Sequence, residues 1–400
     1  MPPLALEALH GEVLARVAEH LGLAAVGHTI TAVEPTDDGY LYGYDLVLAS
    51  APGVVEHRRV FIERASGKSR AGVLAVDLGP HGTFAVWLYP SDPDLPALRE
   101  VVDSRSLGAV LTRLGHPMEP QAINVISYRP GRRAVVRVDG GTSHVYLKVV
   151  EPAKAASIAE RHQQFRSSSL PVPRLLGWSA DGLVAMSELP GVDAQSAVGR
   201  LTKPEAFLDQ LEFLSALLAA VPAFNTARSS LVERIDWYVE RVSSRLPDET
   251  ERVRRIGAMI ARCNADGRSC GYTAVTIHGD LHLGQLFVDE NDPGMITGML
   301  DIDTAGAGDP ADDAAAFYGH IVALGETVAD TQPEYTAACL RLAAAWRSRW
   351  LRNRNAGFAS RASAIAATHL LGHALRPLAS DADGVSRRLI DHAYELVSDW

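Results

Sequence analysis

The stretch His278-Gly279-Asp280-Leu281-His282-Leu283-Gly284-Gln285, followed after a short turn by Leu300-Asp301-Ile302-Asp303, is the most informative part of the chain. It places a carboxylate, a carboxamide and a second carboxylate at a spacing that is typical of phosphoryl transfer. That reaction needs a carboxylate to orient and deprotonate the acceptor hydroxyl, and oxygen ligands to hold Mg²⁺ against the phosphates. Asp280 suits the first role, and Gln285 and Asp301 suit the second. The stretch therefore predicts a kinase.

The residues around this loop indicate how it is held. Three apolar runs, rich in β-branched and aromatic residues, predict short strands at 274–277, 285–288 and 295–302. A turn signal at 290–294 separates the last two runs. A loop between strands would hold Asp280 rigidly, while Gln285 begins the second strand and Asp301 ends the third. We therefore expect their oxygens to converge on one ion.

With these motifs the chain resembles the phosphotransferase family that includes aminoglycoside phosphotransferases, choline kinase and maltokinase. The signature of that family is His-Gly-Asp-x-His-x-x-Asn followed by an Ile-Asp-rich strand, and the resemblance covers residues from about 121 to 330. It implies that Asp280 is the catalytic base, that Gln285 and Asp301 are metal ligands, and that Asp303 is a second-metal or water-held ligand. Gln285 replaces the commoner Asn, and this departure resembles the maltokinase-like branch.

A third segment, Gly308-Asp309-Pro310-Ala311-Asp312-Asp313, resembles the Gly-Asp-Pro-x-x-Asp motif of the same family. The resemblance implies that Asp309 and Asp313 brace the catalytic loop and open a helix. The alternative is that the three segments are ordinary turns and a helix N-cap. That interpretation is disfavoured because it must account for all three segments in the right order.

Charge is distributed unevenly along the chain. Residues 269–340 contain twelve Asp or Glu and no Lys or Arg, so this window carries −12 while the whole chain carries −10. Such a window attracts a divalent metal and a cationic substrate, although a solvated acidic loop accounts for part of it. Residues 129–174 contain nine Lys or Arg against three acids, a local charge of +6. This segment suits a nucleotide.

The basic segment also reads as part of a sheet, with antiparallel strands expected at 122–128, 134–138 and 145–150. Lys148 is a charge inside an apolar strand, which is unfavourable to bury without an anion. The family resemblance supplies the ATP α- and β-phosphates, with Glu160 as the orienting ion pair. Arg132 or Arg133, in the hairpin between the first two strands, is a candidate contact to phosphate. The resemblance also places the hinge at Glu188 and Leu189, where backbone groups would pair with adenine. The alternatives are that Lys148 extends its charged end to solvent, and that Glu160 and Arg132 are exposed residues that bind no nucleotide.

The expected fold class is α+β: a bilobal protein-kinase-like fold with a β-rich N-terminal lobe, a mainly helical C-terminal lobe and an extra N-terminal cap. We expect a cap of one helix and β-strands at 1–100, a nucleotide-binding lobe at 101–188 and a catalytic and substrate-binding lobe at 189–400. Periodicity predicts helices at 4–23, 107–114, 153–165, 230–246, 248–263, 333–352, 362–375 and 386–398, and another that begins near 204. Cap strands are expected at 40–49, 54–63, 72–77 and 83–89. Ser66-Gly67-Lys68-Ser69 lacks the rest of a P-loop and is interpreted as a hairpin turn.

Composition agrees with an enzyme of the cytoplasm. The chain has 400 residues, 47% hydrophobic and 22% charged, which is ordinary for globular proteins. Its three cysteines are too few and too scattered for a disulfide framework or a zinc site, which favours a reducing cytoplasm. No export signal or membrane span is indicated. Low overall basicity also argues against nucleic acid as a partner.

The sequence therefore predicts an ATP- and Mg²⁺-dependent phosphotransferase that acts on a hydroxyl of a small molecule. The acidic half favours an amino sugar or an aminoglycoside as acceptor. A maltokinase- or glucosamine-kinase-like enzyme of sugar metabolism is nearly as well supported. From another class comes a nucleotide-binding regulator or pseudokinase that lost turnover through Gln285. ATP and GTP both remain compatible with the motifs, as does any oligomeric state.

Overall fold

The computed structural model describes residues 3–36, 39–51, 54–65, 70, 72–141, 143–223, 225–353, 355–375, 382–398 and 400. The hairpin turn expected at 66–69 lies outside these residues. The chain forms two compact units: Met1–Glu160 with Leu175–Glu188, and Arg161–Arg174 with Leu189–Trp400. The first unit is rich in strands and the second is mainly helical, so the expected α+β fold class is confirmed.

The first unit begins with a helix packed on an antiparallel sheet. The elements are α1 (Pro3–His20), β1 (Ala24–Thr36), β2 (Gly39–Ala51), β3 (Val54–Arg64), β4 (Leu74–Asp77) and β5 (Thr83–Leu88), with strand order β1-β2-β3-β5-β4. Val13, Leu14 and Val17 of α1 join the buried residues of the sheet in one core. Strand β1 was not predicted. It is an edge strand whose apolar Val26 and Ile30 are exposed, so its sequence lacks the pattern of a half-buried strand.

A second antiparallel sheet completes the first unit. Its elements are α2 (Leu98–Val102), α3 (Leu107–Arg113), β6 (Ala122–Arg129), β7 (Arg133–Asp139), β8 (His144–Val150), α4 (Pro152–Ser167), β9 (Leu175–Ser179) and β10 (Leu183–Ser187), with strand order β6-β7-β8-β10-β9. Every second residue of β7 is buried, which is the period expected of a strand with one face in the core. Helices α2 and α3 share a core with β7 and β8. The three predicted strands of this region and the helix after them are confirmed.

Both sheets belong to the same compact unit, because aromatic side chains connect them. The ring of Phe61 lies 5.9 Å from that of Trp87 and 5.5 Å from that of Tyr128, measured between centroids. Helix α4 is divided between the units: residues 152–160 belong to the first and residues 161–167 to the second.

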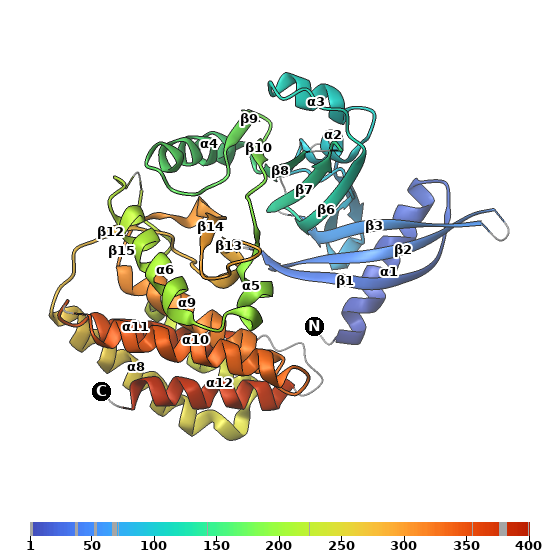
Figure 1. The fold of residues 1–400 in the computed structure, drawn as a ribbon. Coiled ribbons are helices and arrows are strands. Elements are labelled where there is room, and N and C mark those ends of the chain that lie inside the picture. Colours follow the sequence, from blue (N-terminus) through green and yellow to red (C-terminus); the bar gives the residue numbers. More distant parts are fainter. Residues whose placement is uncertain are drawn as a thin grey trace. The chain divides into compact units, whose positions relative to one another are not determined.

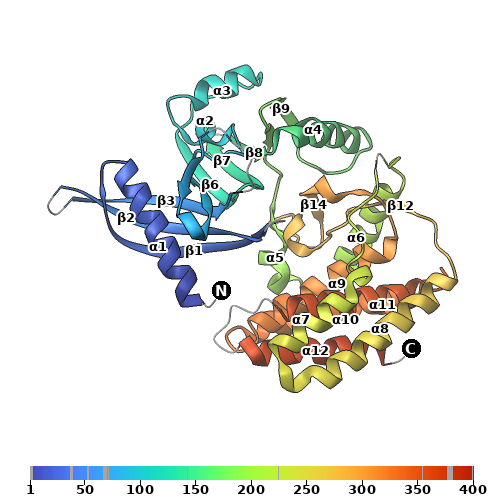
Figure 2. The same ribbon diagram turned by 180° about the vertical axis from the view of Figure 1, so that it is seen from behind.

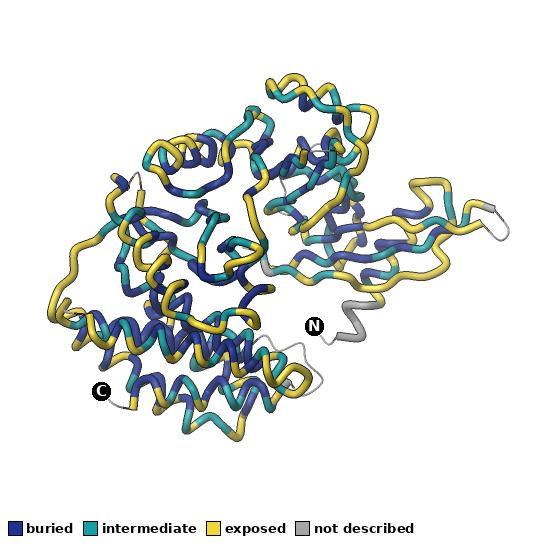
Figure 3. Tube along the Cα trace, in the orientation of Figure 1, coloured by how far each residue is buried: buried dark blue, intermediate teal, exposed yellow. Residues whose placement is uncertain are grey.

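The second unit is a helical assembly centred on α11. Its helices are α5 (Ala194–Ala197), α6 (Pro204–Ala219), α7 (Ile235–Arg245), α8 (Thr250–Ser269), α9 (Pro310–Thr327), α10 (Pro333–Leu351), α11 (Phe358–His373) and α12 (Ala382–Val397). Helix α11 contacts α8, α9 and α12, and the helices lie side by side in both views (Figures 1 and 2). Buried residues, dark blue in Figure 3, extend along nearly all of α11. The predicted helices are confirmed, with boundaries shifted by a few residues. Among the described helices, none combines the length and apolar character that a membrane span requires.

Short strands carry the motif region. They are β11 (Val192–Asp193), β12 (Val275–Ile277), β13 (Leu286–Val288), β14 (Ile296–Met299) and β15 (Gly306–Gly308). Strand β13 pairs with β11 and β14, and β12 pairs with β15, always antiparallel. The three strands predicted around the loop are confirmed. The third ends at Met299, because the Leu300 N–H bonds to the carbonyl of Gln285 and the chain then turns at Asp301.

Candidate functional site

The loop after β12 is fixed by buried hydrogen bonds. The Asp313 carboxylate accepts from the backbone N–H of His278 at 2.7 Å and of Gly279 at 2.8 Å, and the Thr304 hydroxyl donates to the His278 carbonyl at 2.8 Å. Gly279 has φ +80°, and a Cβ there would lie 2.6 Å from the carbonyl oxygen of Thr304. Only glycine satisfies both conditions without strain. The backbone before Asp280 therefore has one well-defined course.

The same loop is tied to the end of β14. The Nε2 atom of His278 lies 2.8 Å from the carbonyl oxygen of Leu300, so Nε2 carries the proton and donates. The next residue, Asp301, has left-handed backbone angles (φ 51°, ψ 45°). This conformation costs a non-glycine residue about 1–2 kcal/mol. Hydrogen bonds on both sides of Asp301 hold this strained conformation in place. Strained backbone that is held by its surroundings is common at functional sites.

Asp280 has two cationic or potentially cationic neighbours. Its Oδ1 lies 3.2 Å from Nη1 of Arg228 and 3.9 Å from Nε2 of His320. The Arg228 backbone N–H donates to the Thr304 carbonyl, which places the arginine next to the loop. The ion pair is partly exposed and contributes little to folding stability. Its position matters more, because it orients the Asp280 carboxylate.

Gln285 and Asp301 are brought together, as the motif predicts. Nε2 of Gln285 lies 3.5 Å from Oδ2 of Asp301 and 3.1 Å from Nε2 of His282. Burial lowers the pKa of His282, and the charges of Asp280 and Asp301 oppose this shift. The carboxylates of Asp280 and Asp301 therefore act on the neutral imidazole of His282, and the carboxamide of Gln285 lies within hydrogen-bond distance of the same ring.

The environment of Asp303 differs from that of Gln285 and Asp301. It lies in a short 3₁₀ turn (Ile302–Thr304), and its carbonyl oxygen accepts a hydrogen bond from Nη1 of Arg161. Burial lowers the pKa of Arg161, and the charge of Asp303 opposes that shift. Asp303 thus lies near a buried guanidinium. The expected role as a metal ligand stays a prediction.

The residues predicted to hold the nucleotide lie mainly in the first unit. Lys148 on β8 is only 5% exposed and pairs in register with Val135 and Val184. Helix α4 packs on this part of the sheet through Ala155 and Ile158, and it also carries Glu160, which is exposed.

The other predicted nucleotide contacts are a turn residue and two residues after β10. Arg132 is exposed in the turn between β6 and β7, at the edge of a cavity of about 520 Å³. Glu188 is exposed, and its charge raises the pKa of Tyr146, although burial is the larger cause. Leu189 is buried in the second unit against Gly298, where a Cβ would lie 2.7 Å from Cδ1 of Leu189.

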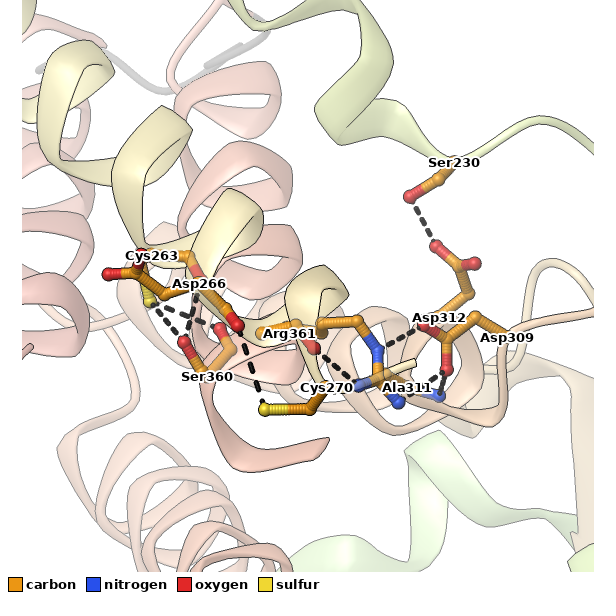
Figure 4. A network of polar contacts seen from close by, with 10 residues as sticks. Ser230, Cys263, Asp266, Cys270, Asp309, Ala311, Asp312, Ser360 and Arg361 are labelled. Carbon is orange, nitrogen blue, oxygen red and sulfur yellow. Dashed lines mark hydrogen bonds and ion pairs between the residues drawn. The ribbon is translucent and has the colours of Figure 1, made fainter. Parts of the chain in front are cut away.

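A buried ion pair holds the start of α9 (Figure 4). The Asp309 carboxylate caps α9 by accepting from the Ala311 N–H at 3.0 Å. It also accepts from Nε of Arg361 at 2.5 Å and from Nη2 at 3.3 Å, and Nη1 of Arg361 donates to the Gly267 carbonyl. Arg361 is 1% exposed. Asp313 braces the loop through the N–H groups of His278 and Gly279, whereas Asp309 opens the helix that carries Asp313 and does not contact the loop in these bonds. Arg361 is the partner that the sequence did not reveal.

Asp312 makes stability depend on pH. Its Oδ1 lies 2.5 Å from the Ser230 hydroxyl (Figure 4), yet burial, aided by the charges of Asp309 and Asp313, raises the pKa of Asp312 from 3.8 to about 7. Between these values the folded protein holds a proton that the unfolded chain releases. The free energy of unfolding therefore decreases as pH rises from about 4 to 7. We expect Asp312→Asn to be more stable than wild type at pH 8, with the difference vanishing toward pH 4.

Urea denaturation at several pH values checks this expectation. Asp236→Asn, which removes an exposed acid from the first turn of α7, is a suitable control. A constant difference between wild type and Asp312→Asn across this range would contradict the assignment.

Sequence reasoning missed two groups of residues at this site. Arg228 lies 52 positions before Asp280, outside the acidic window. His320, His369 and His373 lie on α9 and α11 beside the loop. The spacing of His369 and His373 by four residues on a helix was the available signal, because it places both imidazoles on one helix face.

The chain is similar to one known protein family. The model of the phosphotransferase enzyme family (APH) matches residues 128–349. No curated protein sequence matches the chain. A thermostable mutant of aminoglycoside phosphotransferase APH(4)-Ia in its apo form is 15% identical and has a TM-score of 0.47, covering 72% of this chain and 97% of that one.

Two further solved structures are similar. The GDP complex of wild-type aminoglycoside 2'-phosphotransferase-IIIa is 16% identical, has a TM-score of 0.47, and covers 72% of this chain and 96% of that one. Aminoglycoside phosphotransferase APH(3'')-Id from Streptomyces rimosus is 18% identical, has a TM-score of 0.42, and covers 66% of this chain and 98% of that one. Because the family match spans more than half of the chain and contains the loop, Gln285 and Asp301, this protein belongs to the phosphotransferase enzyme family that includes the aminoglycoside phosphotransferases.

Proposed function

We propose that this protein is an ATP- and Mg²⁺-dependent kinase that transfers the γ-phosphate to a hydroxyl of an amino sugar or an aminoglycoside. The observation that carries the proposal is the approach of the Gln285 carboxamide to Asp301, next to the braced loop of Asp280. Family membership supports phosphotransferase chemistry. The acceptor and the metal are our inference.

The hydrogen bonds of His282 support Gln285 as an oxygen ligand. Nδ1 of His282 accepts the Gly284 N–H at 3.1 Å, so the neutral ring carries its proton on Nε2. That N–H needs an acceptor, and the carboxamide of Gln285, 3.1 Å away, supplies one when its oxygen is turned toward the ring. In the structure the amide nitrogen of Gln285 lies 3.5 Å from Oδ2 of Asp301, and the turn of the amide that satisfies His282 would put the oxygen there instead. Two oxygens facing each other repel unless a cation joins them, and a carboxamide and a carboxylate are ligands that Mg²⁺ accepts.

The chain's own residues then have distinct tasks. A divalent ion held by Gln285 and Asp301 would neutralise charge on the nucleotide phosphates. Arg228 contacts Oδ1 of Asp280, and the described residues offer no partner to Oδ2. We therefore assign Oδ2 to orient the acceptor hydroxyl and to take its proton. Lys148 would bind the non-transferred phosphates.

The charges near His282 support a cationic acceptor. The carboxylates of Asp280, Asp301 and Asp193 all act on this imidazole, while Arg228 is the nearby cation that contacts Asp280. The local balance is negative, which attracts an ammonium group. The acidic window noted in the sequence adds to this field at longer range.

A neutral sugar is the second candidate, favoured by a cavity of about 280 Å³ beside the loop. Its polar lining includes Gln195, His282, His320 and His373, and no acidic side chain among the described residues takes part. Amide and imidazole groups can bind hydroxyl groups without a charge on the ligand. This lining suits maltose as well as a hydroxyl-rich face of an amino sugar.

A panel of acceptors tests the proposed function. ATP consumption is measured with amino sugars, aminoglycosides and neutral sugars, and mass spectrometry identifies products that have gained one phosphate. We expect turnover with an amine-bearing acceptor and less with its neutral analogue. Turnover with neutral sugars alone would select the second candidate. Nucleotide binding without turnover on any acceptor would favour the regulator.

Gln285 provides a direct test of the metal site. We expect Gln285→Ala to raise the Mg²⁺ concentration for half-maximal activity by about 10–100-fold, since it removes one oxygen ligand. Gln285→Asn keeps a carboxamide and should retain more activity at high Mg²⁺. Gln164→Ala, which removes a carboxamide whose nitrogen donates to the Pro222 carbonyl, is the control. An unchanged Mg²⁺ dependence of Gln285→Ala would exclude this residue as a ligand.

A further inference from the structure

Three histidines of the second unit form a cluster that the proposed kinase reaction does not use. One ligand nitrogen from each of His320, His369 and His373 lies within 4.8 Å of the other two. We propose that these residues form a binding site for a d-block divalent cation such as Zn²⁺. It is distinct in position and in chemistry from the oxygen ligands Gln285 and Asp301, because imidazole nitrogen suits zinc and its neighbours and does not suit Mg²⁺.

Two packed helices build the cluster. His369 and His373 are four residues apart on α11, so their imidazoles share one face of that helix. His320 comes from α9, which packs on α11. Gly319 makes the close approach possible at this level, because a Cβ there would lie 2.6 Å from Cβ of His369. The helix contact therefore brings the three imidazoles to one place as part of the core.

The spacing of the rings is close to that of a metal site. The ring of His320 lies 4.6 Å from that of His373 and 5.7 Å from that of His369, measured between centroids. Around a tetrahedral zinc ion with Zn–N bonds of about 2.0–2.1 Å, ligand nitrogens are about 3.3 Å apart. Side-chain rotations that close the gaps by up to about 1.5 Å, from 4.8 Å to about 3.3 Å, would complete the three-histidine set.

The protonation state of the cluster favours a cation. Burial lowers the pKa of His369 to about 3 and that of His320 well below its usual range, and the neighbouring histidines and Arg228 act in the same direction. The imidazoles of His320 and His369 are therefore neutral near pH 7, and a metal need not displace protons from them. The carboxylate of Asp280 lies 3.9 Å from Nε2 of His320 and adds a negative charge at the edge of the cluster.

The cluster also has an open side. His320 and His373 line the 280 Å³ cavity together with His282, whose ring stacks on that of His320 at 4.6 Å. A cavity at this place supplies an entry path and room for a fourth ligand such as water, as in zinc sites with three protein ligands.

Nε2 of His320 is 3.9 Å from Oδ1 of Asp280. Only the imidazole ring of His320 would therefore separate an ion at this site from Asp280. If the proposed kinase function is correct, Zn²⁺ should therefore inhibit phosphoryl transfer. This consequence rests on the proposed function, whereas binding of the metal does not.

Calorimetric titration of the metal-free full-length protein with Zn²⁺ alone, without nucleotide, tests the site. We expect saturable binding of one equivalent to wild type. Removing a residue that only hydrogen-bonds to a metal ligand already weakens metal affinity by about 10–100-fold. Removing a ligand itself should cost more, so we expect His369→Ala and His373→Ala each to weaken Zn²⁺ binding by at least about 100-fold. His57→Ala removes an exposed histidine of β3, and Cys270→Ser removes an exposed thiol; both should bind Zn²⁺ as wild type does.

Co²⁺ provides a readout that does not depend on activity. Wild type loaded with Co²⁺ should show visible ligand-field absorption of a four-coordinate nitrogen site, and the two histidine variants should lose it. Thermal unfolding of each metal-free variant shows whether it is folded, and His373→Ala, at the less buried position, serves if His369→Ala is not. The absence of saturable Zn²⁺ binding to wild type, or unchanged affinity in folded His373→Ala, would overturn the proposal. Neither outcome would affect the kinase assignment, which the acceptor panel tests separately.

Discussion

Replacing Asp280 by Asn is expected to reduce kcat for phosphoryl transfer by about 10²–10⁴-fold, the usual effect of removing a general base. Asn has almost the same shape, so the loop held by Asp313 should keep its course. Its carboxamide can still orient a hydroxyl but cannot take the proton. Nucleotide affinity should change little, because the residues assigned to the nucleotide lie elsewhere.

Rates of product formation and a separate measurement of nucleotide affinity distinguish these effects. Glu290→Gln is a matched control, since it removes one negative charge from an exposed position in the same acidic segment. It should leave kcat near that of wild type. Full turnover by Asp280→Asn with intact nucleotide binding would remove Asp280 from the mechanism.

Replacing Arg361 by Met should lower the free energy of unfolding by about 3–5 kcal/mol, the usual result when one member of a buried ion pair is removed. Asp309 would keep its bond from the Ala311 N–H but lose its only cationic partner among the described residues. The Gly267 carbonyl would lose a donor as well. A buried carboxylate without its counter-ion is the dominant cost.

Urea denaturation of three variants separates charge from packing. Arg254→Met removes a surface guanidinium that is 64% exposed and pairs with Glu251, so its effect should stay within about 0.5 kcal/mol. The double variant Arg361→Met with Asp309→Asn removes both charges while Asn still caps α9, and should recover part of the loss. A cost below about 1 kcal/mol for Arg361→Met would show that the pair is dispensable.

Local signals in the sequence were enough for the elements around the motifs. Apolar runs beside the loop predicted β12, β13 and β14, and the alternation in residues 134–138 predicted β7. The family resemblance, rather than spacing alone, identified Asp309 and Asp313 as residues that brace the loop and open a helix. Their hydrogen bonds show the loop bracing for Asp313 and the helix cap for Asp309. The proximity of Gln285 and Asp301 could be predicted from the sequence, because the start of one strand lies next to the end of the following strand when the two pair antiparallel.

Long-range packing accounts for what the sequence did not predict. Arg361 meets Asp309, and Arg228 meets Asp280, across 52 positions of chain in each case, and neither pairing has a local pattern. The histidine cluster depends on the contact between α9 and α11, which no periodicity specifies. Strand β1 was missed because its apolar residues face outward at a sheet edge.

The distribution of thiols has a practical consequence. Cys263 and Cys339 are buried, and burial raises their pKa, to about 11 for Cys339, whereas Cys270 is exposed. A maleimide fluorophore should therefore label the native protein at Cys270 alone. Cβ of Cys270 lies 3.0 Å from the place where a Cβ of Gly357 would be, at the start of α11. A dye at this junction would report when α8 and α11 separate, and so follow the opening of the helical unit without any engineered residue.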